Sequence, residues 1–267
     1  PEQRNPMKAT SWGVGEMIMN AYRRGVRRFI VGLGGSATSD CGIGMLKAMG
    51  DDWKKIRREC SFVLASDVTN PLYGENGAAH VFAPQKGADA EMVQMLDDRA
   101  RKFAEVSAKH FGYDRSEAPG AGAAGGLGYA FLQYFNAEVR PGAELLLDEI
   151  GFDALIQDAD LVITGEGHSD KQTLMGKLPQ RILEHVLKCR ESDKSHVACS
   201  QLAGDCKSPE SSFPLVWLVS GGVSDRQVML DAGFDRVIQV TPEEMPLDEA
   251  MKPDVARNNI IKVIMNK

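Results

Sequence analysis

Four short segments of the chain combine glycine with hydroxyl, acidic and basic side chains, the residue types that bind and transfer anionic groups. The first, 34–40, reads GGSATSD and follows the apolar run RFIVGL. Glycines and hydroxyls at such a junction leave backbone N–H groups open to an anion, most often a phosphate. The residues predicted to bind this anion are Gly34, Gly35, Ser36, Thr38 and Ser39.

The densest segment, 165–177, reads GEGHSDKQTLMGK and follows the apolar run LVIT. It places two carboxylates and two lysines on one loop, which is more than a connection requires. Asp170 is suited to accept a proton from a substrate hydroxyl, and Lys177 to meet phosphate charge. A purely structural loop is the alternative interpretation.

Two further segments carry weaker signals. In 66–74, SDVTNPLYG, Asp67 and Asn70 offer oxygen ligands or hydrogen bonds, although a capped turn explains them equally well. In 84–88, PQKGA, Lys86 is flanked by turn residues, and a solvated lysine is the simpler interpretation.

These segments need a scaffold, and the apolar pattern predicts an α/β fold with a mainly parallel sheet. Ala90 to His110 and the segment from Leu178 show the apolar rhythm of amphipathic helices. The glycine-rich run 119–128 is expected to be a hinge or a loop over the site. Three of the four segments follow a predicted strand, where open α/β sheets place their ligands. The strands are expected at 28–33, 61–65, 79–83, 160–164, 197–203, 215–220 and 236–240.

The composition excludes several classes of protein. The 267 residues contain 31 Lys and Arg against 37 Asp and Glu, and the basic residues are scattered, which argues against a nucleic-acid surface. No apolar run approaches the roughly 18 residues of a membrane helix. The five cysteines contain no C-x-x-C pair, so no disulfide framework or zinc site is indicated and the cytoplasm is the expected location. A small molecule is the expected partner, with no membrane.

The first segment also imitates a dinucleotide site. Gly32, Gly34 and Ala37 satisfy the pattern G-x-G-x-x-[GA], and Asp52 follows about 20 residues after the first glycine. An NAD-dependent oxidoreductase is therefore an alternative. It is the weaker one, because the acid that binds the ribose should end a second strand and no strand pattern precedes Asp52.

Taken in order, four motifs resemble those of the bacterial type-I glycerate kinases: GLGGSATSDCGIGML, SDVTNPLYGENGAAHVFAPQKGA, PGAGAAGGLGYAF and ADLVITGEGHSDKQTLMGK. The similarity runs from Asn5 to about Lys188 and continues more loosely to the C-terminus. Members of this family phosphorylate D-glycerate with ATP and Mg²⁺. The resemblance therefore implies a phosphotransferase that makes phosphoglycerate, with 2-phosphoglycerate as the expected product.

The resemblance also implies two α/β domains with mainly parallel sheets and an interdomain cleft. Residues 1–50 would belong to the first domain, whose N-terminal portion is expected to be missing. Residues 51–150 would form the second domain, and 151–267 would return to the first.

Residue chemistry and family position together predict roles in this cleft. Asp170 is expected to be the catalytic base and Asp40 the second candidate, and the sequence does not separate the two. Asp67 is expected to hold Mg²⁺, because hard cations prefer oxygen ligands. Further substrate or phosphate contacts are expected from Asn70, Lys86, Glu166, Gln172, Thr173 and Lys177.

Two departures from the family support a further alternative, a truncated or degenerate homologue that binds ligand without catalysis. The family usually begins with a further N-terminal segment, whereas this chain opens on what resembles the interior of a family sequence. The family commonly has arginine and then isoleucine or leucine where this chain has His168 and Ser169. A missing segment would expose sheet edges, so association into a homo-oligomer is one expected outcome.

Overall fold

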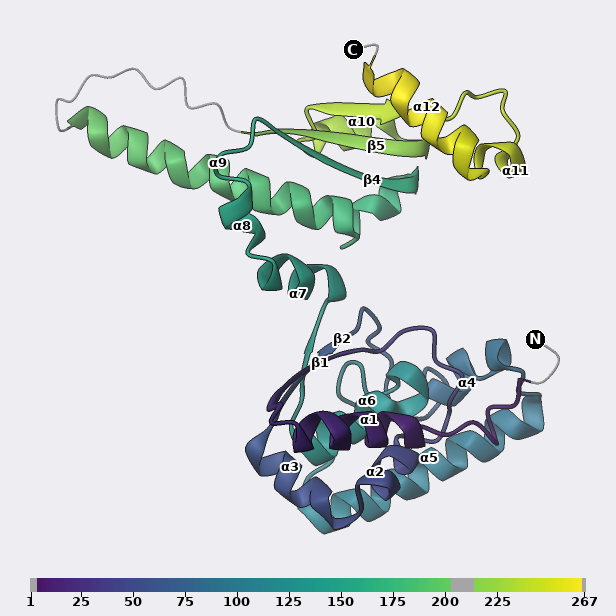
Figure 1. Cartoon of the computed structure of the whole chain (residues 1–267). Coiled ribbons are helices and arrows are strands. Elements are labelled where there is room, and N and C mark those ends of the chain that lie inside the picture. Colours follow the sequence, from purple (N-terminus) through teal and green to yellow (C-terminus); the bar gives the residue numbers. More distant parts are fainter. Residues whose placement is uncertain (1–3, 203–213, 266–267) are drawn as a thin grey trace. The chain divides into compact units, whose positions relative to one another are not determined.

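A computed structural model of the chain describes residues 4–202 and 214–265, with the backbone alone for 192–202 and 265. Contacts divide the chain into two compact units, Pro1–Gly142 and Ala143–Lys267, called unit 1 and unit 2 below. Among the described residues each unit contains one three-stranded parallel sheet with helices around it (Figure 1). The predicted α/β class, with two units and parallel sheets, is confirmed.

Unit 1 is built around the sheet order β1-β2-β3. Phe62 and Leu64 of β2 are buried against α1, α2, α3 and α6, whereas Ile30 on β1 is 48% exposed. The elements are α1 (Trp12–Arg23), β1 (Arg28–Gly32), α2 (Ile43–Met49), η1 (Gly50–Asp52), α3 (Trp53–Glu59), β2 (Ser61–Ala65), α4 (Ala78–Phe82), η2 (Pro84–Lys86), α5 (Ala90–Phe111), α6 (Ala123–Phe135) and β3 (Glu138–Arg140).

The glycine-rich segment before and within α6 packs closely against neighbouring backbone and side chains, whereas the sequence suggested a hinge or a loop over the site. Gly125 and Gly126 have φ values of +67° and +85°, a region that side chains rarely adopt. A Cβ on Gly125 would overlap the carbonyl oxygen of Thr38, and one on Gly126 would lie 2.7 Å from Leu72 Cδ1. Cys41 N donates to Gly125 O at 3.1 Å. The glycines therefore let α6 support the back of the loop that follows β1.

Unit 2 repeats this plan with the sheet order β4-β5-β6. Val216 and Leu218 of β5 are fully buried in a core shared with α9, which lies along the sheet (Figure 1), whereas Ile163 on β4 is 48% exposed. The elements are α7 (Gly142–Glu149), α8 (Phe152–Leu155), β4 (Leu161–Ser169), η3 (Lys171–Leu174), α9 (Leu178–Leu202), β5 (Leu215–Val223), α10 (Arg226–Asp231), β6 (Arg236–Gln239), α11 (Leu247–Ala250) and α12 (Pro253–Met265).

Two predicted strands are wrong and one strand was missed. The segment predicted as a strand at 79–83 is mostly α4. Ala79 in this helix and its C-cap Ala83, four residues later, are buried against α5. The segment predicted at 197–203 is helical through residue 202, the end of α9, and residue 203 lies outside the described residues. Its sequence VACSQLA holds a single β-branched residue, which favours helix. The short β3 was not predicted.

The contacts also divide the chain differently from the predicted domains. The sequence placed a boundary near residue 50 and returned the chain to the first domain at 151. In the structure β1 pairs with β2 along its whole length, so residues on both sides of position 50 share one sheet and one unit.

Candidate functional site

In unit 1 a buried lysine forms hydrogen bonds to the loop that follows β1. Lys86 is 7% exposed, and its Nζ donates to Ser36 Oγ at 3.0 Å and to Thr38 O at 2.7 Å. Burial lowers the pKa of Lys86 to about 8, because the charged form is separated from water. Within the described ranges no carboxylate forms an ion pair with it. A buried ammonium that lacks a counter-charge is well suited to receive an anion.

The loop and Lys86 line a pocket of about 920 Å³ in unit 1. Arg4 and Lys8 from the N-terminal segment add two more cations, and none of the described residues that line the pocket is acidic. Gly34, Gly35 and Ser36 form the adjoining wall, and Gly35 has a φ of +63°. The structure therefore brings the predicted Gly34, Gly35, Ser36, Thr38 and Lys86 together. Arg4 and Lys8 were missed because nothing in their local pattern distinguishes them from solvated residues.

Asp40 is held by the protein itself. Its Oδ2 accepts from Ser11 N at 2.8 Å, Ser11 Oγ at 2.9 Å, Gly44 N at 3.1 Å and Thr10 Oγ1 at 3.3 Å, and its Oδ1 accepts from Gly42 N at 3.2 Å. These bonds join the start of α1 to the start of α2. The geometry favours a structural role for this carboxylate.

The other predicted residues of unit 1 also form hydrogen bonds within the protein. Asp67 is exposed and its Oδ1 accepts from Gly142 N at 3.0 Å, and Asn70 Nδ2 donates to Asn76 O at 2.9 Å. No set of three His, Cys, Asp or Glu side chains in the described ranges could hold a metal ion. Mg²⁺ bound through ligand phosphates needs only one or two carboxylates, so Asp67 as a ligand stays a prediction.

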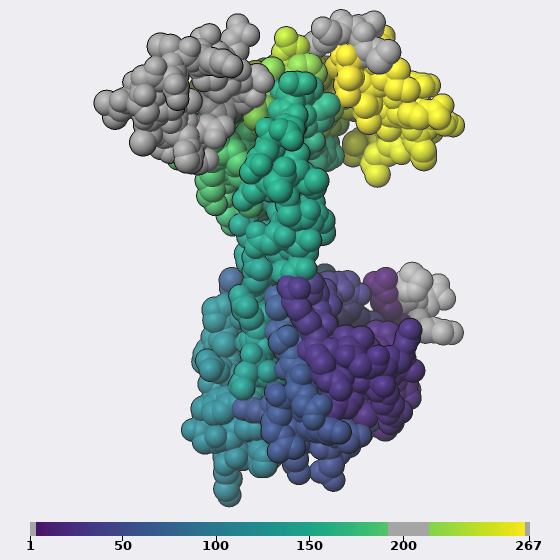
Figure 2. Space-filling model, turned by 60° about the vertical axis from the view of Figure 1, so that its left-hand side comes forward, coloured from purple at the N-terminus to yellow at the C-terminus, as the bar shows by residue number. Residues whose placement is uncertain are grey.

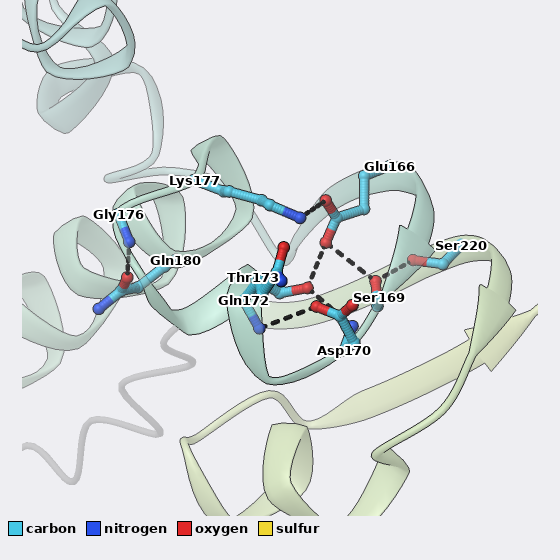
Figure 3. A network of polar contacts seen from close by, with 9 residues as sticks. All are labelled: Glu166, Ser169, Asp170, Gln172, Thr173, Gly176, Lys177, Gln180 and Ser220. Atoms are coloured by element: carbon cyan, nitrogen blue, oxygen red, sulfur yellow. Dashed lines mark hydrogen bonds and ion pairs between the residues drawn. The ribbon is translucent and has the colours of Figure 1, made fainter. Parts of the chain in front are cut away.

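In unit 2 a partly buried network surrounds Glu166 in the second half of β4 (Figure 3). Its Oε1 accepts from Thr173 Oγ1 at 2.5 Å and from Ser169 Oγ at 3.2 Å, and its Oε2 lies 3.4 Å from Lys177 Nζ. Ser169 Oγ also bonds Ser220 Oγ on β5. Ser169 and Ser220 were missed, because buried serines carry no distinguishing pattern in sequence. The structure thus unites Glu166, Thr173 and Lys177, as predicted, but with their polar groups directed largely at one another.

Asp170 begins η3 as its cap. Its Oδ1 accepts from Gln172 N at 2.8 Å, and its own N donates to Thr173 Oγ1 at 3.1 Å (Figure 3). Its side chain also accepts from the backbone N–H of Thr173, which completes a capping box. The Asp170 carboxylate is therefore held by two backbone donors of η3, fewer than the five hydrogen bonds that Asp40 accepts.

Two features expected from the sequence change in the structure. The predicted loop 165–177 begins as strand, because β4 continues through Ser169, and His168 Nε2 lies 2.8 Å from Ser224 Oγ beyond β5. Asp52 lies in the turn η1 and not at a strand end, so the dinucleotide interpretation gains no support.

In the described part of the chain, no helix has both the length and the apolar character needed to cross a membrane.

Comparison with known proteins gives consistent matches. The family model described as "Glycerate kinase family" matches residues 1–57 and 51–266. The "Glycerate kinase" of Bacillus subtilis is 34% identical over 94% of this chain and 67% of its own length, and the "Glycerate 2-kinase" of Escherichia coli K12 is 32% identical over 99% and 70%. A crystal structure described as a "putative glycerate kinase 2 from Salmonella typhimurium LT2" aligns with a TM-score of 0.73 at 32% identity, covering 100% of this chain and 69% of that one.

Proposed function

The chain belongs to the glycerate kinase family, and from this premise we propose that it binds glycerate and transfers a phosphoryl group from ATP to its hydroxyl. The observation that carries the proposal is the buried Lys86, which is bonded to the 34–39 loop and has no carboxylate partner among the described residues. Phosphoryl transfer requires a site that neutralises phosphate or carboxylate oxygens and aligns the acceptor. The three cations of the unit 1 pocket provide that neutralisation.

The chemistry of the donors agrees with a phosphorylated ligand. Backbone N–H groups near Gly34 and Gly35, the hydroxyl of Ser36 and the ammonium of Lys86 are donors to oxygen anions. When bound, ATP supplies the phosphoryl group, and Mg²⁺ neutralises its phosphate charge with Asp67 as the proposed protein ligand.

In unit 2 we assign the base to Asp170 and give Glu166 a positioning role. The Asp170 carboxylate is the acceptor for the glycerate hydroxyl proton, and its hydrogen bonds to the start of η3 hold it in place. Glu166 holds Lys177, whose ammonium meets phosphate charge from the half-exposed surface. Thr173 is fully buried and orients both Glu166 and Asp170. Gln172 is exposed, and its side chain is free to contact substrate in this assignment.

The 2-hydroxyl is the proposed acceptor position. Its support is the similarity over nearly the whole chain to a relative that carries the name glycerate 2-kinase. A cytoplasmic location also remains part of the proposal, in keeping with the five scattered cysteines.

A second candidate function is ligand binding without catalysis. It is favoured by one observation: both candidate bases bond within the fold, Asp40 through five hydrogen bonds and Asp170 as the cap of η3. In that case the Lys86 pocket would still bind a phosphorylated or carboxylated small molecule.

The test measures turnover with ATP, Mg²⁺ and D-glycerate for the chain, for Lys86→Met and for Lys177→Met. Lys86→Met is expected to lower kcat/KM at least about 100-fold, because it removes a desolvated donor to the reacting anion. Lys177→Met is expected to lower it about tenfold or less, since Lys177 is 42% exposed and already paired. Glycerate or phosphoglycerate binding without turnover would select the second candidate. Absence of both binding and turnover would contradict the proposal, and NMR of the product identifies the phosphorylated hydroxyl.

A further inference from the structure

Unit 1 contains a second pocket, of about 430 Å³, which shares Lys8 with the first and to which the proposal above assigns no ligand. It lies between the N-terminal segment, the start of α2 and the helix α5. The N-terminal residues form part of the surface of this unit, seen in purple in Figure 2. Lys8 and Ala9 line both pockets, whereas Lys47 and Arg99 line only the second.

The charge of this second pocket favours an anion. Lys8, Lys47 and Arg99 are exposed, and none of the three forms an ion pair recorded in the described ranges. Arg99 has only a weak contact, 3.9 Å from its Nη1 to Met7 Sδ. The opposing carboxylate is Asp40, whose oxygens already accept five hydrogen bonds from neighbouring donors. Three cations that have no ion pair in the described ranges therefore line this pocket together with one acid whose oxygens already accept hydrogen bonds from the protein.

The lining of the second pocket includes a buried hydroxyl that is available to bond a ligand. Ser39 is 8% exposed, and its Oγ is buried with no hydrogen-bond partner among the described residues. An unpaired buried hydroxyl is unfavourable, so an oxygen of a bound ligand would relieve it. Ser39 lines the second pocket and not the first, although the sequence grouped it with the loop residues of the first pocket.

The rest of the lining is apolar and includes an aromatic face. Trp12 is 44% exposed at the pocket, and Leu96, Ile43 and Met7 complete the apolar wall. Indole faces stack on planar rings such as nucleobases. A pocket of this size falls in the range that binds small ligands.

We propose that the second pocket binds a small phosphomonoester with a planar body, of the type of a nucleoside monophosphate. Its phosphate meets Lys47, Arg99 and the hydroxyl of Ser39, and its planar body packs against Trp12. The inference stands on residues of this pocket and does not depend on the proposed kinase reaction. Because Lys8 lines both pockets, a ligand here also lies next to the Lys86 site.

The test uses AMP and inorganic phosphate as probes of the whole chain, with binding followed by isothermal titration calorimetry and by tryptophan fluorescence. AMP is expected to bind more tightly than inorganic phosphate and to change the emission of Trp12, a change that disappears in Trp12→Phe. The double variant Lys47→Ala/Arg99→Ala is expected to weaken AMP binding about tenfold or more, since it removes two charge-assisted contacts.

Two controls separate binding in the second pocket from a general effect of net charge and from binding in the first pocket. Lys54→Ala/Arg58→Ala on α3 removes the same charge from exposed positions and should leave AMP binding unchanged. Lys86→Met should also leave it nearly unchanged, while kinase turnover reports on the first pocket separately. The proposal is overturned if AMP fails to bind, if inorganic phosphate binds equally well, or if Lys86→Met abolishes AMP binding while Lys47→Ala/Arg99→Ala does not.

Discussion

Two lysines, one in each unit, differ in burial and in ion pairing, and therefore in how strongly each should attract an anion. Lys86 of unit 1 is 7% exposed, bonded to neutral oxygens, and lacks a carboxylate partner among the described residues. Lys177 of unit 2 has a side chain 42% exposed and lies 3.4 Å from Glu166. The first is unfavourable in its charged form and gains from a bound anion, whereas the second is already neutralised. Affinity for the anion should therefore depend mainly on unit 1.

The acidic residues show the opposite arrangement. Asp40 of unit 1 accepts five hydrogen bonds from the protein, while Asp170 of unit 2 accepts from two backbone N–H groups at the start of η3. The comparison predicts that unit 1 supplies anion binding and unit 2 supplies the acceptor for the substrate proton.

The largest expected effect tests this division through Asp170→Asn. Turnover should fall by roughly 10²–10⁴, as for the loss of a general base, with little change in the free energy of unfolding because the amide oxygen still caps η3. Asp40→Asn should instead lower the free energy of unfolding of unit 1 by about 2 kcal/mol, because donors to a charged acceptor lose their partner. Steady-state kinetics and chemical denaturation of both variants measure the difference. A large loss of stability in Asp170→Asn, or a purely catalytic loss in Asp40→Asn, would reverse the assignment.

The next effect compares two glycines with positive φ. Gly125→Ala should destabilise unit 1 by about 2–4 kcal/mol, because its Cβ would overlap the backbone of Thr38 in addition to the strained φ. Gly176→Ala should cost only about 1 kcal/mol, since its nearest neighbour would be the flexible end of Arg181 at 3.4 Å. Thermal unfolding of the two variants compares a glycine that is packed closely against backbone with a glycine in an open turn. Equal shifts in Tm would show that α6 does not support the loop.

The smallest expected effect is that of Glu166→Gln. The amide keeps an acceptor for Ser169 and Thr173 and loses only the ion pair with half-exposed Lys177. The free energy of unfolding should fall by about 1 kcal/mol or less, and less still at high salt. Denaturation at two ionic strengths measures it, and a loss of several kcal/mol would mean that the pair is effectively buried.

The sequence predicted the fold class and most strands because apolar runs and their spacing report local structure. It predicted β2 at its observed bounds and the two long helices α5 and α9 from their first residues. It failed at 79–83 and 197–203, where short apolar runs do not distinguish helix from strand.

The sequence singled out residue types for the candidate site but not their partners in the fold. Motif spacing drew attention to Lys86, Asp170 and Glu166, and their roles stay predictions. Burial, which the motifs do not report, decides whether a lysine is solvated or favours a bound anion. The saturation of Asp40 depends on Ser11 and Thr10, some 30 residues earlier in the chain, and no local pattern records such a contact. Arg4 and Lys8 reach the pocket through the same kind of distant packing.

The central claim is that Lys86, buried with no carboxylate partner among the described residues, favours a bound anion, and its pKa tests this most directly. Since the folded pKa is about 8, below the unfolded value near 10.5, the buried charge destabilises unit 1 below pH 8 and this penalty is relieved as the pH rises toward 10.5. A bound anion favours the charged form, so it should raise the pKa, and its affinity should fall by up to about tenfold per pH unit above pH 8. NMR titration of Lys86 Nζ with and without 2-phosphoglycerate should give a pKa near 8 for the free chain and a value at least about one unit higher in the complex. A pKa near 10.5 in the free chain that does not change with ligand would contradict the account.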